Sequence, residues 1–107
     1  MQFNTFTTAV LAALGLAAQA YGVTYELFTD ANCQNKLTDL VIDPVSCATP
    51  SPGWSSMKLL GPGDDRTVTV YSVNNCGTPS AGSQQYAADY ADCLGNFGFV
   101  ANAAGLF

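Results

Sequence analysis

The chain repeats part of its own sequence, and this repeat constrains the fold more than any other feature. Residues 23–33 match residues 66–76 at an offset of 43 positions. The matched pairs are Phe28 and Tyr71, Thr29 and Ser72, Asn32 and Asn75, and Cys33 and Cys76. Each segment is followed by a second cysteine, Cys47 or Cys93, and then by an aromatic-led run at 54–60 or 97–101. One unit of about forty residues is too short to bury a core alone, so two copies are expected to pack together.

Each copy opens with a pattern that predicts a β-strand. Val23, Tyr25 and Leu27 alternate with polar residues, and Val68 and Val70 alternate with threonines. Period-two alternation of β-branched and aromatic residues is typical of a half-buried strand. Asparagine and aspartate then supply turn chemistry in both copies. The sequence therefore predicts an antiparallel all-β domain of short strands.

The remaining segments are assigned by composition. An apolar run at 37–42 continues the strand pattern, whereas Gly-Pro-Gly-Asp-Asp at 61–65 predicts the loop that joins the two copies. Residues 79–85 are interpreted as a polar loop and residues 87–94 as a helical turn. No long amphipathic helix is expected.

Residues 1–20 have the features of a secretory signal peptide. An uninterrupted apolar run at 10–18 is too short to span a bilayer, which needs roughly 20 residues. Ala18 and Ala20 place small residues before Tyr21, so cleavage is expected there. The segment before the run carries no Lys or Arg, and the alternative is a buried helix of the mature fold. The expected product is a secreted, extracellular domain of 87 residues, 21–107, with no membrane anchor.

The four cysteines and the net charge indicate how the domain is stabilised and which partners are disfavoured. All four lie after the signal peptide, and an even number in a short exported chain favours two disulfides. Zinc is disfavoured because the chain has no histidine and no Cys-x-x-Cys. A formal net charge of −5 makes nucleic acid and anionic membranes poor partners.

The opening of each copy resembles the Greek-key motif of the βγ-crystallins. That motif has an aromatic residue, four residues, a second aromatic, one residue and then glycine. Residues 28–35 and 71–78 keep the leading aromatic and the spacing, and residues 54–59 resemble a later part of the motif. The resemblance implies a β-sandwich of two Greek keys, motif one at 21–62 and motif two at 63–107. Two positions depart from the family: cysteine replaces the second aromatic (Cys33, Cys76), and Asn35 and Thr78 replace glycine.

The repeat and the resemblance together imply a disulfide pairing. Four cysteines allow three connectivities, and spacing alone does not choose among them. Because both copies replace the same aromatic by cysteine, we expect each cysteine to be bonded within its own copy. The expected pairs are Cys33–Cys47 and Cys76–Cys93.

The resemblance suggests calcium as a cofactor. Microbial family members bind calcium through two Asn or Asp, two arbitrary residues and Ser/Thr-Ser. Ser55-Ser56 matches the end of that signature, but Ser51 and Pro52 stand at its acidic positions. Calcium prefers several carboxylate or carbonyl oxygens. The residues left as weak candidate ligands are Ser56, Asp64 and Asp65, and no cofactor is otherwise expected.

Catalysis is not expected, and binding is. The chain has no histidine to act as a base, and its cysteines are better explained as disulfides. Most aromatic residues fall at core positions of the strands. The candidate exposed aromatics are Trp54, for which a core position is the favoured alternative, and Tyr86 and Tyr90.

Two roles follow from these observations. The first is a secreted, monomeric, non-enzymatic protein that acts by binding, as an effector or like the antimicrobial and killer-toxin-like proteins that this plan resembles. The alternative is a structural or cell-wall-associated extracellular protein that binds polysaccharide or calcium. The sequence leaves the protein or polysaccharide target unidentified.

Overall fold

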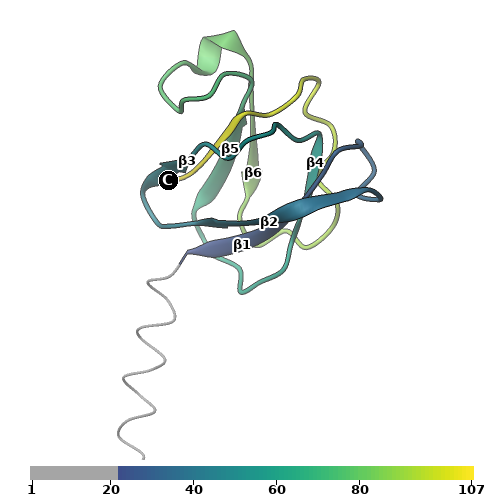
Figure 1. The fold of residues 1–107 in the computed structure, drawn as a ribbon. Coiled ribbons are helices and arrows are strands. Elements are labelled where there is room, and N and C mark those ends of the chain that lie inside the picture. The colour runs from purple at the N-terminus through teal and green to yellow at the C-terminus, as the bar shows by residue number, and fades with distance from the viewer. Residues whose placement is uncertain (1–21) are drawn as a thin grey trace, which may run out of the picture.

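Two antiparallel β-sheets make up the fold that the computed structural model describes for residues 22–107 (Figure 1). One sheet has three strands in the order β2-β1-β4 and the other has four in the order β3-β7-β5-β6. The strands are β1 (Val23–Phe28), β2 (Lys36–Ile42), β3 (Ser46–Ala48), β4 (Ser56–Leu59), β5 (Thr67–Tyr71), β6 (Ser83–Ala87) and β7 (Ala103–Leu106). A short 3-10 helix, η1 (Pro79–Ala81), precedes β6. The all-β, disulfide-containing β-sandwich expected from the sequence is confirmed.

The inward-facing residues of both sheets form one core. In β1, Tyr25 and Leu27 are fully buried, and in β5 Val68 and Val70 are fully buried, as the period-two pattern predicts. The two central strands also pair in matching ways. Tyr25 lies opposite Leu59 of β4, and Val68, its counterpart in the repeat, lies opposite Leu106 of β7. The sequence repeat is therefore also a repeat of strand register.

The third strand of the first copy joins the sheet of the second copy. After β2, the chain crosses over, and β3 pairs with β7 rather than with β1 or β2 (Figure 1). The second copy makes the reciprocal contact through Leu94, which exchanges two backbone hydrogen bonds with Met57 of β4 (3.0 and 2.8 Å). Each sheet thus receives one segment from the other copy, and the two copies cannot separate without breaking the β3–β7 pairing and the Leu94–Met57 bridge.

The disulfides connect the two copies, so the expected pairing is wrong. Cys33 is bonded to Cys93 and Cys47 to Cys76, with Cα atoms 6.0 and 5.9 Å apart. The reason is the exchange of third segments. Cys47 lies in β3 and Cys93 directly precedes Leu94, so the second cysteine of each copy is carried to the other copy's sheet. The repeat correctly implies that both bridges are of the same kind, but each one runs between copies.

Three local expectations also differ from the structure. Residues 83–85, expected within a polar loop, belong to β6, an exposed edge strand that is paired on one side only. Residues 87–94 form a turn and an extended segment instead of a helical turn. The last strand, β7, begins two residues after the aromatic-led run at 97–101. The proposed signal peptide, residues 1–20, lies outside the described part of the chain, and no helix within residues 22–107 is long and apolar enough to cross a membrane.

Candidate functional site

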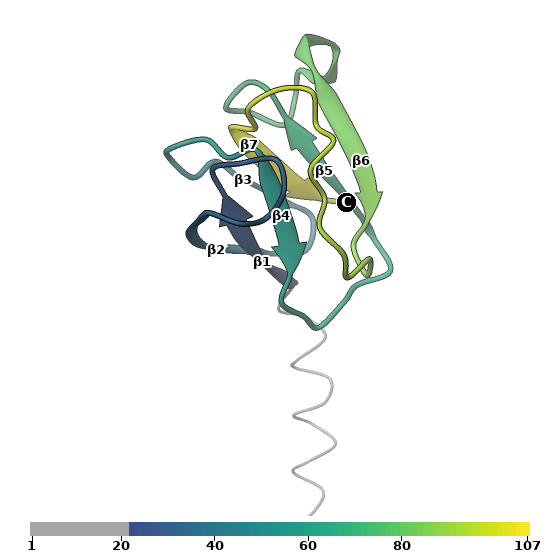
Figure 2. The same cartoon turned by 90° about the vertical axis from the view of Figure 1, so that its right-hand side faces the viewer.

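A hollow of about 410 Å³ lies between the end of β6 and the segment that follows it. It is lined by Tyr86, Ala87, Tyr90, Cys93, Leu94, Gly95 and Asn96. Figure 2 shows the segment between β6 and β7 running from the edge of the four-stranded sheet toward β4 of the other sheet. The hollow therefore lies at the side of the sandwich, where the two layers meet.

Tyr86 is held in one orientation at the floor of the hollow. It lies opposite Val68 in the β5–β6 pair, so its side chain points toward the space between the sheets. Its ring packs against that of Phe97, with centroids 6.0 Å apart, and its hydroxyl donates a 2.7 Å hydrogen bond to Oδ1 of Asn96. Burial raises the pKa of the Tyr86 hydroxyl, which keeps it protonated and able to donate. A tyrosine fixed at both ring and hydroxyl presents a defined surface to a ligand.

The same hydrogen bond fixes the amide of Asn96. Because Oδ1 accepts from Tyr86, the orientation of the amide is set by its partner. The amide nitrogen has no hydrogen-bond partner among the described residues and keeps both N–H groups for a ligand. Asn96 is exposed, so these donors are reachable from solvent.

Tyr90 also lines the hollow and is half-exposed. Its backbone N–H donates to the carbonyl oxygen of Ala87 (3.2 Å), which closes the turn after β6. Half of its surface is open to solvent, a large fraction for an aromatic side chain. Tyr86 and Tyr90, the pair expected to form a surface patch, thus line one hollow together.

The wall of the hollow that contains Cys93 and Gly95 packs against the hairpin loop between β1 and β2. Gly95 approaches that loop so closely that a Cβ on it would lie 1.9 Å from the carbonyl oxygen of Ala31. The Cys33–Cys93 disulfide ties the same loop to the same segment. This wall of the hollow is therefore fixed by a covalent bond and by a close backbone contact.

Trp54 does not belong to this surface. Only 1% of it is exposed, and its backbone forms a two-way hydrogen-bonded bridge with Ala101 (3.0 and 2.7 Å). Its indole nitrogen is buried and has no hydrogen-bond partner within residues 22–107. Trp54 is a core residue, so the expectation that places it on an exposed binding surface is wrong and its alternative, the core position, is correct.

Of the three weak calcium candidates, Ser56 lies apart from the neighbouring residues Asp64 and Asp65. Ser56 begins β4, whereas Asp64 and Asp65 lie in the loop beyond the other end of that strand. The buried hydroxyl of Ser56 donates to the carbonyl oxygen of Asp30 and accepts from the backbone N–H of Cys33 (3.0 Å). Its hydrogen-bonding capacity is therefore used by the hairpin loop.

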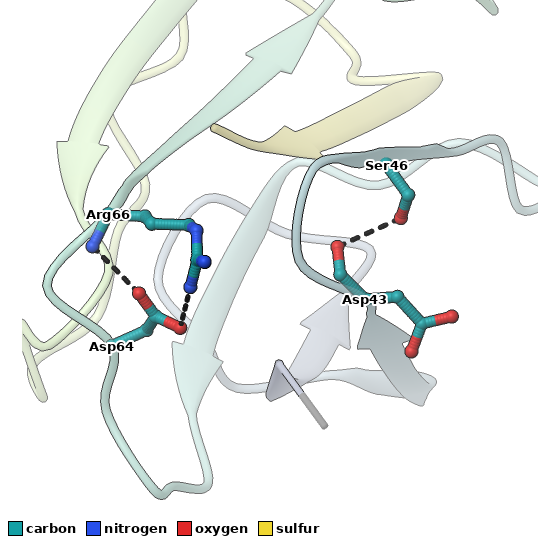
Figure 3. A network of polar contacts seen from close by, with 4 residues as sticks. All are labelled: Asp43, Ser46, Asp64 and Arg66. Carbon is teal, nitrogen blue, oxygen red and sulfur yellow. Dashed lines mark hydrogen bonds and ion pairs between the residues drawn. The ribbon is translucent and has the colours of Figure 1, made fainter. Parts of the chain in front are cut away.

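Asp64 already has a cationic partner. Its carboxylate accepts hydrogen bonds from the backbone N–H of Arg66 (2.8 Å) and from its guanidinium (2.9 Å), as Figure 3 shows. The same figure shows Ser46 donating to the backbone carbonyl of Asp43, a contact that closes the loop before β3. Within residues 22–107, no three metal-binding side chains come together.

Three residues of the hollow are not marked by any sequence motif or period-two pattern. Asn96 and Gly95 lie in an irregular segment, and Leu94 is recognisable only through its bridge to Met57. The spacing from Cys93 to the aromatic Phe97 marks this segment, but only the fold shows what it faces. A scan against protein-family models found no matching family, and comparisons with curated proteins and with solved structures found no match.

Proposed function

We propose that this protein is an exported, monomeric, non-enzymatic binding protein that acts on another cell, as an effector or an antimicrobial protein. The observation that carries the proposal is the hollow that Tyr86, Tyr90 and Asn96 line. It offers aromatic surface and free amide donors, but no nucleophile and no base. Concave sites that combine apolar surface with a few oriented polar groups are typical of ligand binding.

The disulfides support export. Two bridges in a chain with no free cysteine among the described residues indicate folding in an oxidising compartment. The signal-peptide features of residues 1–20 supply the route. The net charge of −5 disfavours an action that depends on binding anionic membranes, so a specific surface target is the better mode.

We further propose that the domain is a diverged member of the βγ-crystallin type. Its support is the order of segments in the two sheets. Each sheet contains the first, second and fourth strands of one copy plus the third segment of the other. The cysteines in place of the second aromatics then act as cross-links between the copies.

The test combines export with cell binding. The full chain is expressed in a secreting eukaryotic host, and mass spectrometry of the medium is expected to give a product beginning at Tyr21 with both disulfides formed. The purified, fluorescently labelled product is then applied to yeast, filamentous fungal, bacterial and plant cells. Saturable binding to at least one cell type, with a growth or cell-death phenotype, is expected. Retention of the chain inside the host, or no binding to any cell type, would contradict the proposal.

A further inference from the structure

The lining of the hollow is uncharged. Its side chains are two phenols, one amide, one leucine, one alanine and a disulfide-bonded cysteine. Its volume of about 410 Å³ falls in the range of small-ligand sites, about 300–1,000 Å³. A ligand that fits must therefore gain its affinity from ring contacts and neutral hydrogen bonds.

Hydrogen-bonding groups and aromatic rings line the hollow together. Asn96 holds the Tyr86 hydroxyl at 2.7 Å and keeps two amide N–H groups free among the described residues, and Tyr90 offers its half-exposed ring. An aromatic face is electron-rich and attracts weakly positive C–H groups, whereas the amide donates to oxygen. A matching ligand has C–H groups on its face and hydroxyl groups around its edge.

The surrounding charge selects among ligands with that shape. Asp89 and Asp92, both exposed, flank Tyr90 in the sequence, and Arg66 is bonded to Asp64. The exposed Lys58 follows Met57, the backbone partner of Leu94, so the repulsion of an anion depends on Asp89, Asp92 and the net charge of −5. A negatively charged ligand is repelled by this surface. A cationic ligand would be attracted by Asp89 and Asp92, but it finds no carboxylate among the lining residues to pair with inside the hollow.

We infer that the hollow binds a neutral carbohydrate, as one or two sugar residues of a longer chain at a cell surface. This inference rests on the proposed function and names the ligand class of the same site. A sugar ring stacks its C–H face on Tyr90, and its hydroxyl groups accept from the amide of Asn96 and bond to the hydroxyl of Tyr86. The rest of a longer chain extends into solvent, because the lining residues Tyr90 and Asn96 are exposed.

The test is an NMR titration of the isotope-labelled, disulfide-bonded protein, residues 21–107. The probes are hexasaccharides of β-1,3-glucan, β-1,4-glucan and chitin, with an oligogalacturonate of equal length as the anionic comparison. We expect amide shifts confined to residues 86–96 with at least one neutral probe and at least tenfold weaker binding of the oligogalacturonate. No shift with any neutral probe at 10 mM, or shifts centred elsewhere, would overturn the inference.

Variants connect the shifts to the hollow. Tyr90→Ala is expected to weaken binding at least tenfold, and Tyr86→Phe, which removes only the hydroxyl, several-fold. The matched control is Phe107→Ala, because Phe107 is exposed to a similar extent (54% against 50% for Tyr90) and does not line the hollow. Phe107→Ala is expected to leave the affinity unchanged, and thermal unfolding of each variant verifies its fold.

The cell assay separates the two ideas. If wild-type protein binds cells and Tyr90→Ala binds them equally well, the carbohydrate inference fails while the proposed function stands. If the wild-type protein binds a neutral hexasaccharide in solution but no cell, the inference stands and the proposed function fails. Equal loss of carbohydrate binding in Tyr90→Ala and Phe107→Ala would show that the hollow is not the site.

Discussion

Cys33 and Cys93 are bonded to each other across the two copies of the repeat, 60 positions apart in the sequence. The second bridge, Cys47–Cys76, spans 29 positions in the same manner. Each joins the first cysteine of one copy to the second cysteine of the other. The cross-links therefore hold together two copies that already share their third segments.

Removing one bridge tests both its energy and its partners. In the chain-entropy estimate, loss of Cys33–Cys93 costs about 4 kcal/mol and loss of Cys47–Cys76 about 3.5 kcal/mol, because longer loops lose more entropy when closed. We expect Cys33→Ala/Cys93→Ala to lower the free energy of unfolding by about the first amount, measured by urea denaturation.

The discriminating variant is Cys33→Ala/Cys47→Ala. It breaks both bridges of the structure but only one bridge of a within-copy arrangement. We expect it to be less stable than either variant that removes a bonded pair. Equal stability of Cys33→Ala/Cys47→Ala and Cys33→Ala/Cys93→Ala would disprove the connectivity.

Gly95 is predicted to be intolerant of alanine. The added Cβ would lie 1.9 Å from the carbonyl oxygen of Ala31, so the hairpin loop must move away from the segment that carries Cys93. Overpacking of this kind costs about 1–3 kcal/mol, and more where the backbone itself obstructs the new atom. Thermal unfolding measures the loss. Gly77→Ala is the control, because its nearest contact is at an ordinary 3.7 Å, and it is expected to change the free energy of unfolding by less than about 0.5 kcal/mol.

Ser56→Ala is predicted to weaken the attachment of the same hairpin loop to β4, because two hydrogen bonds are lost. The variant leaves the carbonyl oxygen of Asp30 and the N–H of Cys33 without the hydroxyl that bonds both. Unpaired groups at a buried site cost about 1–3 kcal/mol. Ser55→Ala, at the neighbouring and less buried position, is expected to have little effect in the same urea denaturation. A Ser56→Ala protein as stable as Ser55→Ala would contradict the role assigned to these bonds.

Tyr25 is predicted to make the protein sensitive to alkali. Burial of the side chain raises its pKa to about 12, with smaller contributions from the negative charges of Asp89 and Asp64. Between the unfolded-state value of about 10 and the folded-state value, the native protein keeps a proton that the unfolded chain releases. Stability is therefore complete below pH 10 and falls as the pH rises toward 12, by about 1.4 kcal/mol per pH unit.

Tyr25→Phe tests this linkage. The hydroxyl is buried and has no hydrogen-bond partner in the described part of the chain, so its removal is expected to raise the free energy of unfolding at pH 7 by about 1 kcal/mol. The variant is also expected to lose less stability than the wild type between pH 10 and 11.5 in chemical denaturation. Tyr90→Phe, at a half-exposed position, is the control and should keep the wild-type alkaline slope.

Val45 is a position where the natural residue opposes the local backbone. Its φ is +55°, a left-handed conformation that β-branched side chains rarely adopt, and two thirds of the residue is exposed. Val45→Asn is expected to stabilise the protein by about 1 kcal/mol, because asparagine tolerates this conformation. Val41→Asn, at an exposed position within β2, is the control and is expected to give no gain in thermal unfolding.

The strands that the sequence predicts are those in which apolar and polar residues alternate with a period of two. The patterns at 23–27, 37–42 and 67–70 correspond to β1, β2 and β5, and the Gly-Pro-rich segment 61–65 is the loop between β4 and β5. Strand β6 was missed because its sequence, Ser-Gln-Gln-Tyr-Ala, carries no apolar alternation at an exposed edge. Strand β7 was missed because Ala103–Leu106 is buried on both faces and has no polar residue to mark a period.

Some residues of the candidate site are indicated by the sequence, whereas others are placed there only by the tertiary structure. The sequence paired Tyr86 with Tyr90 as surface aromatics, and the structure places both in one hollow. It left Trp54 between an exposed surface and the favoured core position, and the structure places it in the core, 1% exposed and bridged to Ala101. Asn96 gained its place only through the hydrogen bond from Tyr86, ten positions away.

By itself, the sequence determined a duplicated β-domain and two cross-links of one kind, because alternation and repetition are local properties of the chain. The tertiary structure decided which cysteines meet, which aromatics are exposed and where a hollow forms. The physical reason is the exchange of third segments: β3 and Leu94 pair with the sheet of the other copy. The contacts that depend on this exchange join residues far apart in the chain, and no local sequence pattern indicates that these residues will meet.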